Sequence, residues 1–483
     1  MSKLRLRYAP SPTGFLHIGN TRTALMNYLF AKHYKGDFIV RIEDTDLERN
    51  VDGAIESQFE NMNWLGIFAD ESFLKPATGF GKYKQSAKFD VYEKIANQLL
   101  NDEKAYKCFC TPEELEADRE KQANLGNPAP QYNKKCAKLS EAQINELESK
   151  KVPANIRFAV PENKDYKTDD IVRGEVVFNS KEIGDFVILK SNKIATYNFA
   201  VVIDDIDMKI THVVRGEEHI SNTPRQLMIY EALKAKPPIF CHLTLIVDEN
   251  HKKLSKRSGN EMFFISQYKS QGYLPEALFN YIGLLGWSPA GEAEIFTKEE
   301  FIKIFDEKRF SKSPSTFDVN KLKWINSQYM KKISESDYLD FIKEFINKEK
   351  FDLSKYSIAD IDKILILFKR EIEFGVQIND HLDLFFNDNL KMDEATKSIL
   401  KELGDIKNMA IKVSEQFNNL KDWNEDNIKG IVKAIGLELN RKGKELFMPI
   451  RILTTGFEHG PELAKTIEIL GKDQVLKNIN KIK

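Results

Sequence analysis

The sequence predicts an α/β protein in which a parallel-sheet domain is interrupted by an α+β insertion and followed by an all-helical C-terminal region. Strand and helix signals alternate over residues 4–43 and again over residues 210–247, as in a parallel sheet. Polar helices and short alternating strands fill about residues 91–196 between them. Beyond about residue 320 strand signals fade, and amphipathic helical patterns dominate.

The first β-α-β unit is expected over residues 4–43. Alternating apolar side chains predict a strand at residues 4–8, and residues 21–35 form a helix with one apolar face. Gly36 is expected to end that helix, and residues 37–43 return as a second strand. Ligands of such sheets bind at the carboxyl ends of the strands.

The second unit repeats this order with a strand at 210–214, a helix at 222–233 and a single strand at 239–247. The expected domains are the first half of the parallel-sheet domain (1–90), the insertion (91–196), the second half (197–248), a domain that carries a basic loop (249–320) and the helical region (321–483).

Composition indicates a folded, soluble chain. Of its 483 residues, 42% are hydrophobic and 30% charged, which is typical of globular domains rather than disordered chains. We expect no membrane segment and no secretory signal, and 4 cysteines in so long a chain fit a reducing cytoplasm. The net charge of −1 neither requires nor excludes a nucleic-acid partner, because binding needs only a local basic face.

Two motifs together indicate ATP binding. The loop from Arg7 to Asn20, rich in Pro and Gly, opens a predicted helix, whose N-terminal N–H groups attract anions. Downstream, Lys253-Leu-Ser-Lys-Arg257 offers cations that can close over phosphates. Taken alone, each motif also has an ordinary structural interpretation. His17 and Gly19 could be a buried histidine and a glycine at the start of a helix, and the basic turn could be solvated surface.

Six motifs occur in this order: Arg7-x-Ala-Pro-Ser-Pro-Thr-Gly14, His17-Ile-Gly19, Arg41-Ile-Glu-Asp-Thr-Asp46, Thr196-Tyr-Asn-Phe-Ala200, Arg215-Gly-Glu-Glu-His219 and Lys253–Arg257. Together they resemble the class I glutamyl-tRNA synthetases of bacterial type. Asn20, Leu254 and Arg257 depart slightly from the family pattern. The resemblance implies a class I Rossmann-type catalytic domain with an inserted acceptor-binding domain, a stem-contact domain and a helical anticodon-binding region.

The resemblance further implies a two-step reaction. ATP, with Mg²⁺ on its phosphates, activates L-glutamate to glutamyl-adenylate, and the glutamyl group then passes to the 3′-terminal adenosine of tRNA(Glu). Positioning and charge neutralisation carry such chemistry. The catalytic residues implied are His17, Lys253 and Lys256, and the ATP-binding residues are Thr13, His17, Gly19, Glu217, Lys253, Ser255 and Lys256.

Glutamate presents two carboxylates and one ammonium group. Arg7 and Arg215 suit the carboxylates, since arginine forms bidentate bonds with them. The ammonium is expected at Glu43, Ser11 and the Ala9 carbonyl, and Tyr197 and His219 complete the pocket.

Several alternatives stand beside this interpretation. A glutaminyl-tRNA synthetase resembles Pro-Pro-Glu-Pro-Asn-Gly at the first loop, which this chain lacks. A short paralogue that glutamylates queuosine lacks the anticodon end, and a non-catalytic RNA-binding relative would not need His17, Lys253 and Lys256. The sequence leaves open whether tRNA(Gln) is charged as well. The resemblance favours a monomer.

A zinc site is expected in the insertion, from Cys108-x-Cys110 and Tyr132-x3-Cys136. A Cys-x-Cys turn can offer two thiolates to one structural, tetrahedral Zn²⁺. Some relatives place a histidine where this chain has Lys138, so Tyr132 is the better fourth ligand. Three reduced, partly buried thiols are the equal alternative, and Cys241 is left over.

Candidate tRNA contacts lie in the helical region. Lys321 and Lys323 are expected near the tRNA stem, and Lys369 with Arg370 near the third anticodon base. A Lys-Arg pair on a helix otherwise belongs to solvated surface.

Overall fold

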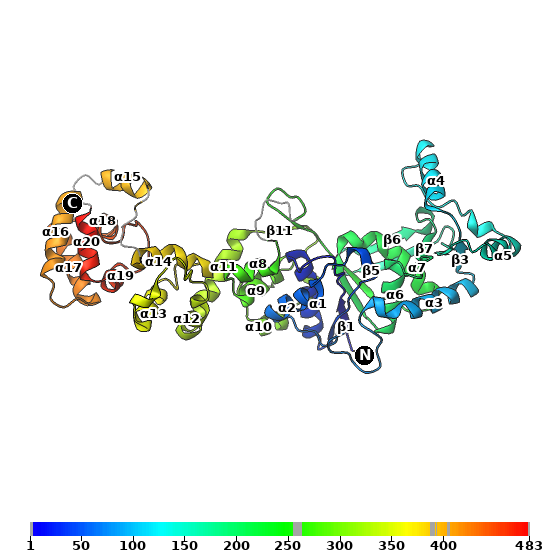
Figure 1. Cartoon of the computed structure of the whole chain (residues 1–483), viewed down its shortest axis with the longest axis horizontal. Helices are drawn as coiled ribbons and strands as arrows, with labels where there is room; N and C mark the ends of the chain where they lie inside the picture. The colour runs from blue at the N-terminus through cyan, green and yellow to red at the C-terminus, as the bar shows by residue number, and fades with distance from the viewer. Residues whose placement is uncertain (1–2, 255–262, 387–391, 393, 403–405, 482–483) are drawn as a thin grey trace. The chain divides into compact units, whose positions relative to one another are not determined.

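The computed structural model describes residues 3–254, 263–386, 392, 394–402 and 406–481 (Figure 1). It forms two compact units, one made of Met1–Gln267 and Leu278–Asp318 and the other of Tyr268–Ala277 and Val319–Lys483. The first unit is α/β, whereas every described element from Val319 onward is a helix. The predicted fold class is therefore confirmed.

A four-stranded parallel sheet organises the first unit, in the order β2-β1-β8-β9. Helices cover both faces: Figure 1 shows α1 and α2 on one side of β1, and α3, α6 and α7 on the other. The elements are β1 (Arg5–Tyr8), α1 (Ile18–His33), β2 (Asp37–Val40), α2 (Ala54–Trp64), α3 (Phe89–Asn101), α6 (Tyr197–Asp207), β8 (His212–Gly216), α7 (Thr223–Ala232) and β9 (Ile239–Leu243).

Helix α1 differs from its predicted form in two ways. It begins at Ile18 rather than at residue 21, because the side chain of His17 caps it. Buried positions run around the helix rather than along one face, and they include Thr21 and Asn27. The reason is that α1 packs on the sheet and also against α10 (Lys298–Ile304).

The single strand predicted at 239–247 is wrong. The structure has β9, followed after Thr244 and Leu245 by a separate β10 (Ile246–Val247), which pairs with β11 (Ser315–Thr316). The chain leaves the parallel sheet there because the backbone groups of these two residues bind side chains: Thr244 accepts a hydrogen bond from Arg22, and Leu245 donates one to Glu217.

The insertion forms an antiparallel sheet of the order β3-β4-β7 and a β5-β6 hairpin. One hydrophobic core runs from this sheet into the parallel-sheet domain and joins Tyr92, Phe158, Ile188, Phe199 and Phe240. The elements are β3 (Ala105–Cys108), α4 (Pro112–Asn124), α5 (Glu141–Ser149), β4 (Asn155–Phe158), β5 (Asp165–Asp170), β6 (Gly174–Asn179) and β7 (Phe186–Leu189).

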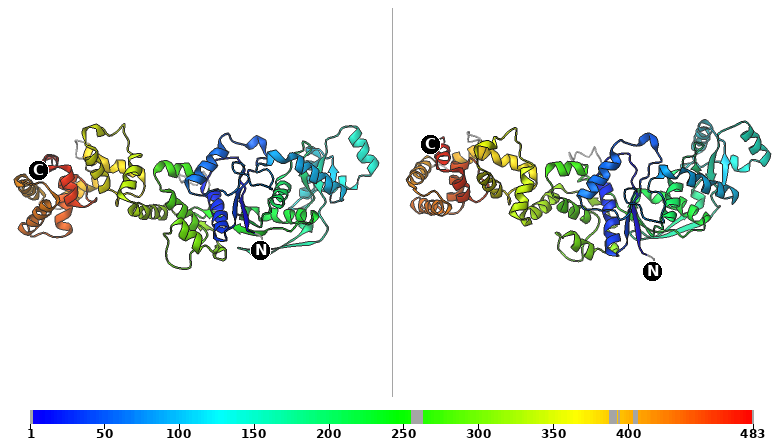
Figure 2. Two further views of the ribbon diagram at one scale, coloured as in Figure 1. Left: turned by 90° about the horizontal axis from the view of Figure 1, so that it is seen from below. Right: turned by 60° about the horizontal axis from the view of Figure 1, so that its bottom comes forward.

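The second unit is built from helices, with a hydrophobic core where α16 to α20 pack on one another (Figure 2). Two helices, α8 (Ile265–Gln271) and α9 (Pro275–Leu284), span the division between the units. The others are α11 (Val319–Lys332), α12 (Glu335–Lys343), α13 (Ile358–Leu367), α14 (Ile378–Phe386), α15 (Glu394–Glu402), α16 (Ile406–Asn419), α17 (Glu425–Glu438), α18 (Lys444–Thr455), α19 (Leu463–Leu470) and α20 (Lys472–Asn480).

Candidate active site

Two adjoining cavities open at the carboxyl ends of the parallel strands, where β1 and β8 lie side by side and their following helices go to opposite sides. This is the switch point at which doubly wound sheets bind ligands. The cavities measure about 520 Å³ and about 370 Å³. They share the wall residues Ser11, Thr13, Asn20, Thr23, Gly216 and Glu218.

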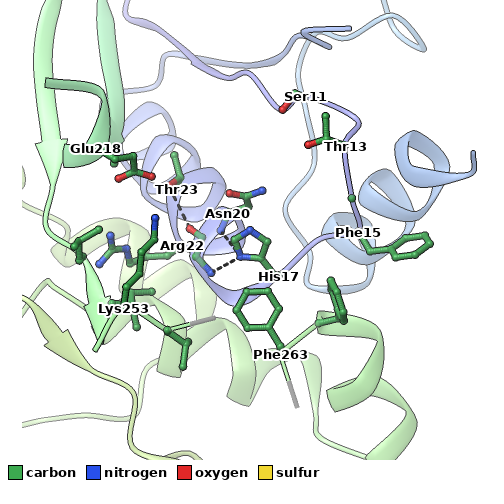
Figure 3. A pocket seen from close by; sticks show the side chains of 17 residues that line it. Ser11, Thr13, Phe15, His17, Asn20, Arg22, Thr23, Glu218, Lys253 and Phe263 are labelled. Atoms are coloured by element: carbon green, nitrogen blue, oxygen red, sulfur yellow. Dashed lines mark hydrogen bonds between the residues drawn. The ribbon is translucent and has the colours of Figure 1, made fainter. Parts of the chain in front are cut away.

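The larger cavity contains the N-terminus of α1 (Figure 3). The Nδ1 of His17 accepts hydrogen bonds from the backbone N–H of Gly19 at 3.1 Å and of Asn20 at 3.4 Å. In a neutral imidazole this leaves the ring proton on Nε2. A Cβ on Gly19 would lie 3.1 Å from the Cε1 of His17, so a glycine here lets the histidine cap the helix. The ring also stacks on Phe263 at 4.7 Å.

The cations and anions of this cavity partly match the sequence prediction. Lys253 and Thr13 line it, and Figure 3 shows Lys253 across from His17. Glu217 lies outside the lining: it pairs with Arg173, and its Oε1 accepts from the N–H of Leu245 at 2.9 Å. The neighbouring Glu218 lines both cavities instead. Ser255, Lys256 and Arg257 lie outside the described residues.

Arg22 is a cation of this wall that sequence reasoning missed. It lies on α1 and is buried, with Nη2 donating to the carbonyl of Thr244. Burial lowers the pKa of Arg22 to about 10, and Glu218 partly offsets that effect. Arg22 therefore stays charged at neutral pH and adds positive potential beside the helix N-terminus.

The smaller cavity has a buried charge network beneath it. Arg7 donates from Nε to both carboxylate oxygens of Asp205, at 3.1 and 3.3 Å. Arg41, which is 0% exposed, lies 2.7 Å from the same carboxylate and 3.0 Å from Glu43. Burial raises the pKa of Glu43, while Arg41 and Arg7 pull it back down. Burial opposes ionisation of Asp205 as well, but the two arginines outweigh it and lower that pKa.

Arg215 lines the same cavity in a different environment. Its nitrogens donate to neutral acceptors: Nε to the Nε2 of His242 at 3.1 Å, Nη1 to Gln226 at 2.9 Å and Nη2 to Thr223 at 2.9 Å. No carboxylate of the described residues lies within salt-bridge distance of it. Burial lowers the pKa of Arg215, and Asp205 partly offsets that effect from beyond salt-bridge distance. Such a group attracts an anionic ligand.

All seven residues predicted to bind glutamate line this cavity. Tyr197 and His219 form its far side, with ring centroids 5.8 Å apart. Burial and the nearby Arg215 lower the pKa of His219 to about 4, so the imidazole is neutral at pH 7. The seven are Arg7, Ala9, Ser11, Glu43, Tyr197, Arg215 and His219.

The predicted zinc ligands converge in the insertion. Cys108, Cys110 and Cys136 are buried, free of disulfides, and their sulfur atoms lie within 4.8 Å of one another. The Tyr132 hydroxyl lies 3.5 Å from the Sγ of Cys108 and 3.4 Å from that of Cys110. Tetrahedral Zn²⁺ with bonds of about 2.3 Å to sulfur and about 2.1 Å to oxygen separates these ligands by about 3.5 Å. The four side chains fit a zinc ion.

The surroundings of Tyr132 bear on its charge. Burial raises the pKa of its phenol above the ordinary value, so the phenol ionises only if a metal ion supplies the compensating charge. The guanidinium of Arg157 lies 3.9 Å from the centre of the Tyr132 ring. This cation offsets negative charge on the ligand set.

The four candidate tRNA contacts lie in the helical unit. Lys321 and Lys323 are on α11, and the Lys323 ammonium lies 5.8 Å from the ring centre of Phe374. Lys369 donates to the carbonyl of Ile333 and so has a structural partner. Arg370 is exposed.

The chain matches two known protein families over nearly its whole length. The family described as tRNA synthetases class I (E and Q), catalytic domain, matches residues 3–324, and an anticodon binding domain matches residues 336–483. Among similar curated proteins, the glutamate–tRNA ligase of Mycoplasma mycoides subsp. mycoides is 62% identical over 479 residues and covers 99% of both chains. That of Geobacillus thermodenitrificans is 50% identical over 481 residues, with 99% of this chain and 98% of the relative covered.

A solved structure agrees. A glutamate tRNA ligase from Elizabethkingia meningosepticum, crystallised in complex with its amino acid, superposes with a TM-score of 0.89 at 34% identity over 99% of both chains. The chain therefore belongs to the glutamate–tRNA ligase family of class I aminoacyl-tRNA synthetases. This outcome favours the glutamate enzyme over the glutaminyl enzyme and the short paralogue. None of the described helices is both long and apolar enough to cross a membrane.

Proposed function

We propose that the two adjoining cavities hold glutamate and ATP for the first step of tRNA glutamylation. One observation carries the assignment: Arg215 is a buried cation without a carboxylate partner among the described residues, in a cavity that shares six wall residues with the one at the N-terminus of α1. Unpaired buried positive charge favours a carboxylate substrate, and a helix N-terminus favours a phosphate chain.

In this proposal an α-carboxylate oxygen of glutamate attacks the α-phosphorus of ATP, the bond from that phosphorus to the bridging oxygen breaks, and pyrophosphate leaves. Mg²⁺ bound with ATP would offset the charge of the phosphates. Arg7 and Arg215 hold the carboxylates, and the substrate ammonium lies at Glu43, Ser11 and the Ala9 carbonyl. His17 donates from Nε2 to a phosphate oxygen as charge develops there. Thr13 and Gly19 border the nucleotide. Lys253 and Lys256 offset the charge of the phosphates, and the hydroxyl of Ser255 can donate a hydrogen bond to them. Glu218 lines the cavity where Glu217 was expected.

The second step transfers glutamate to the 3′-terminal adenosine of tRNA(Glu), and AMP leaves. We assign residues 91–196 to the acceptor end, residues 249–320 to the stem and residues 321–483 to the anticodon. The acceptor assignment is supported by the core that the insertion shares with the catalytic sheet. Lys321, Lys323, Lys369 and Arg370 are the proposed tRNA-contacting residues.

Exchange of labelled pyrophosphate into ATP, with tRNA present, tests the first step. Exchange should depend on glutamate and stay at background with glutamine. Glutamine-dependent exchange would contradict the assignment of Arg215. Charging of purified tRNA(Glu) and tRNA(Gln) then decides whether the enzyme also glutamylates tRNA(Gln).

A structural Zn²⁺ is proposed at Cys108, Cys110, Cys136 and Tyr132. When bound, it would tie the Cys-x-Cys turn to the segment that carries Tyr132 and Cys136. Metal analysis of protein purified without chelator should find one zinc per chain, and none in Cys110→Ser. We expect Tyr132→Phe to bind zinc about 10- to 100-fold more weakly. Unchanged affinity would remove the phenol from the site.

We also propose that the chain acts as a monomer in the cytoplasm. The four cysteines are all free, which supports a reducing compartment. Light scattering should give the mass of one 55.7 kDa chain, and a concentration-dependent dimer would contradict the proposal.

A further inference from the structure

A buried carboxylate–imidazole pair, Asp170 and His242, lies behind Arg215, and neither residue lines the two cavities. The Nδ1 of His242 is 2.6 Å from the Oδ2 of Asp170, and its Nε2 is 3.1 Å from the Nε of Arg215. All three side chains are at least 95% buried. Asp170 ends strand β5 of the insertion hairpin, and His242 lies on β9, one strand away from Arg215 on β8.

The hydrogen bonds fix the tautomer of His242. A guanidinium can only donate, so the Nε2 of His242 accepts from Arg215 and the ring proton lies on Nδ1. That proton is donated to Asp170. Burial is the main cause that lowers the pKa of His242, partly offset by Asp170, so the imidazole stays neutral at pH 7. Asp170 is itself held by the backbone N–H groups of Val172 and Arg173, each at 2.9 Å.

The guanidinium of Arg215 is thus held at three points by neutral acceptors. An arginine has five N–H donors, and His242, Gln226 and Thr223 each accept one of them. Donors remain for a bidentate carboxylate. Asp170 contacts the imidazole and not the arginine, so the pair orients Arg215 without forming a salt bridge to it.

We propose that Asp170 and His242 are positioning residues that aim Arg215 at a carboxylate of the substrate and so strengthen the binding of glutamate. The proposal rests on the proposed function, because it requires Arg215 to bind a carboxylate of glutamate. It assigns to Asp170, a residue of the insertion, a part in amino-acid recognition. The contrast with Arg7 supports it, since Arg7 is held directly by the carboxylate of Asp205.

Two substitutions at His242 separate the two ring nitrogens. His242→Gln keeps an acceptor that can reach Arg215 and loses the donor to Asp170, whereas His242→Asn keeps that donor and loses the acceptor. Asp170→Asn turns an amide donor toward Nδ1, which favours the Nε2–H tautomer and sets a donor against Arg215. His459→Asn, at an exposed histidine beside Glu458, is the matched control.

Pyrophosphate exchange is measured with glutamate and ATP varied separately. We expect His242→Asn and Asp170→Asn to raise KM for glutamate roughly 10- to 100-fold, as loss of a hydrogen bond to a charged group does, with KM for ATP and the rate at saturating glutamate nearly unchanged. His242→Gln should raise KM for glutamate by a smaller factor, and His459→Asn should leave it unchanged. Equal KM for glutamate in all four variants would overturn the proposal while glutamate-dependent exchange by the wild type upholds the proposed function.

A measurement on the unaltered enzyme covers the case in which a variant fails to fold. The chain has only 8 histidines, so an NMR spectrum of protein labelled with ¹⁵N at histidine contains few ring signals. The signal that disappears in His242→Gln identifies His242. If that variant does not fold, the ring coupled to the Arg215 guanidinium identifies it instead. Nδ1 should carry the proton in the wild type at pH 7. A proton on Nε2 would overturn the proposal.

Discussion

The two cavities at the edge of the parallel sheet are built in different ways. The smaller one has charged side chains in its wall, among them Arg7, and Arg7 is fixed from beneath by the buried Asp205, which also pairs with Arg41. The larger one contains the N-terminus of α1, with its backbone N–H groups, His17 as the helix cap and Lys253 in the wall. Fixed side chains discriminate between ligands that differ by one group, whereas backbone N–H groups recognise any phosphate chain.

The difference also divides stability from binding. A buried charge held by opposite charges belongs to the fold, because removal of one member leaves the others unpaired. A buried charge held by neutral acceptors, such as Arg215, leaves no opposite charge unpaired when it is removed, and it is available to a ligand. The two arginines of one cavity should therefore respond differently to the same substitution.

The largest expected effect tests that contrast. Arg7→Ala leaves Asp205 facing only Arg41, so we expect it to lower the free energy of unfolding by about 3 to 5 kcal/mol and to weaken glutamate binding as well. Arg215→Ala should weaken glutamate binding by about 2 to 5 kcal/mol, because a substrate carboxylate is left unpaired, with a much smaller effect on unfolding. Thermal melts and KM for glutamate measure the two quantities.

Arg215→Lys sharpens the result, since it keeps the charge and loses the planar fork. It should recover only part of the glutamate affinity. Two alanine variants with equal losses of stability would show that Arg215 is structural in the same way as Arg7, and the comparison between them would fail.

A smaller effect is expected in the larger cavity, which His17 lines. His17→Ala removes both the helix cap and the Nε2 donor, and it should slow adenylate formation about 100- to 1000-fold with tRNA affinity nearly intact. His17→Asn restores a good cap without a donor at the position of Nε2. It should therefore recover thermal stability but not the rate. If His17→Asn restored the rate, the contribution of His17 would be the cap alone.

The sequence allowed prediction of those parts of the site whose residues are close together in the chain. His17 and Gly19 are two residues apart, and the capping of α1 joins them locally. The Cys-x-Cys turn with Tyr132 and Cys136 likewise lies within one stretch of the insertion, so its convergence followed from spacing and resemblance.

The parts that could not be predicted depend on pairing over long distances in the chain. Asp205 meets Arg7 only because α6 packs on the sheet, and no pattern near Asp205 distinguishes it from a surface carboxylate. Asp170 reaches His242 because the insertion hairpin runs beside β9. Strand lengths failed for a similar reason: the apolar run at 239–247 carries no sign of the side chains that divide it.

The smallest effect concerns pH, and it should appear in one cavity alone. In the proposed site Glu43 pairs with the substrate ammonium, and it can do so only when its carboxyl is ionised. Burial raises the pKa of Glu43 above the ordinary value, so its protonation begins at a higher pH than that of an exposed glutamate. As pH falls through that pKa the carboxylate is lost, and KM for glutamate should rise about tenfold, the smaller effect typical of a lost charged hydrogen bond. KM for ATP should stay constant over the same range. The free substrate titrates too, but it does so equally for wild type and Glu43→Gln, which lacks the titrating group. The wild-type curve should rise toward that of the variant at low pH; parallel curves would show that Glu43 does not hold the ammonium.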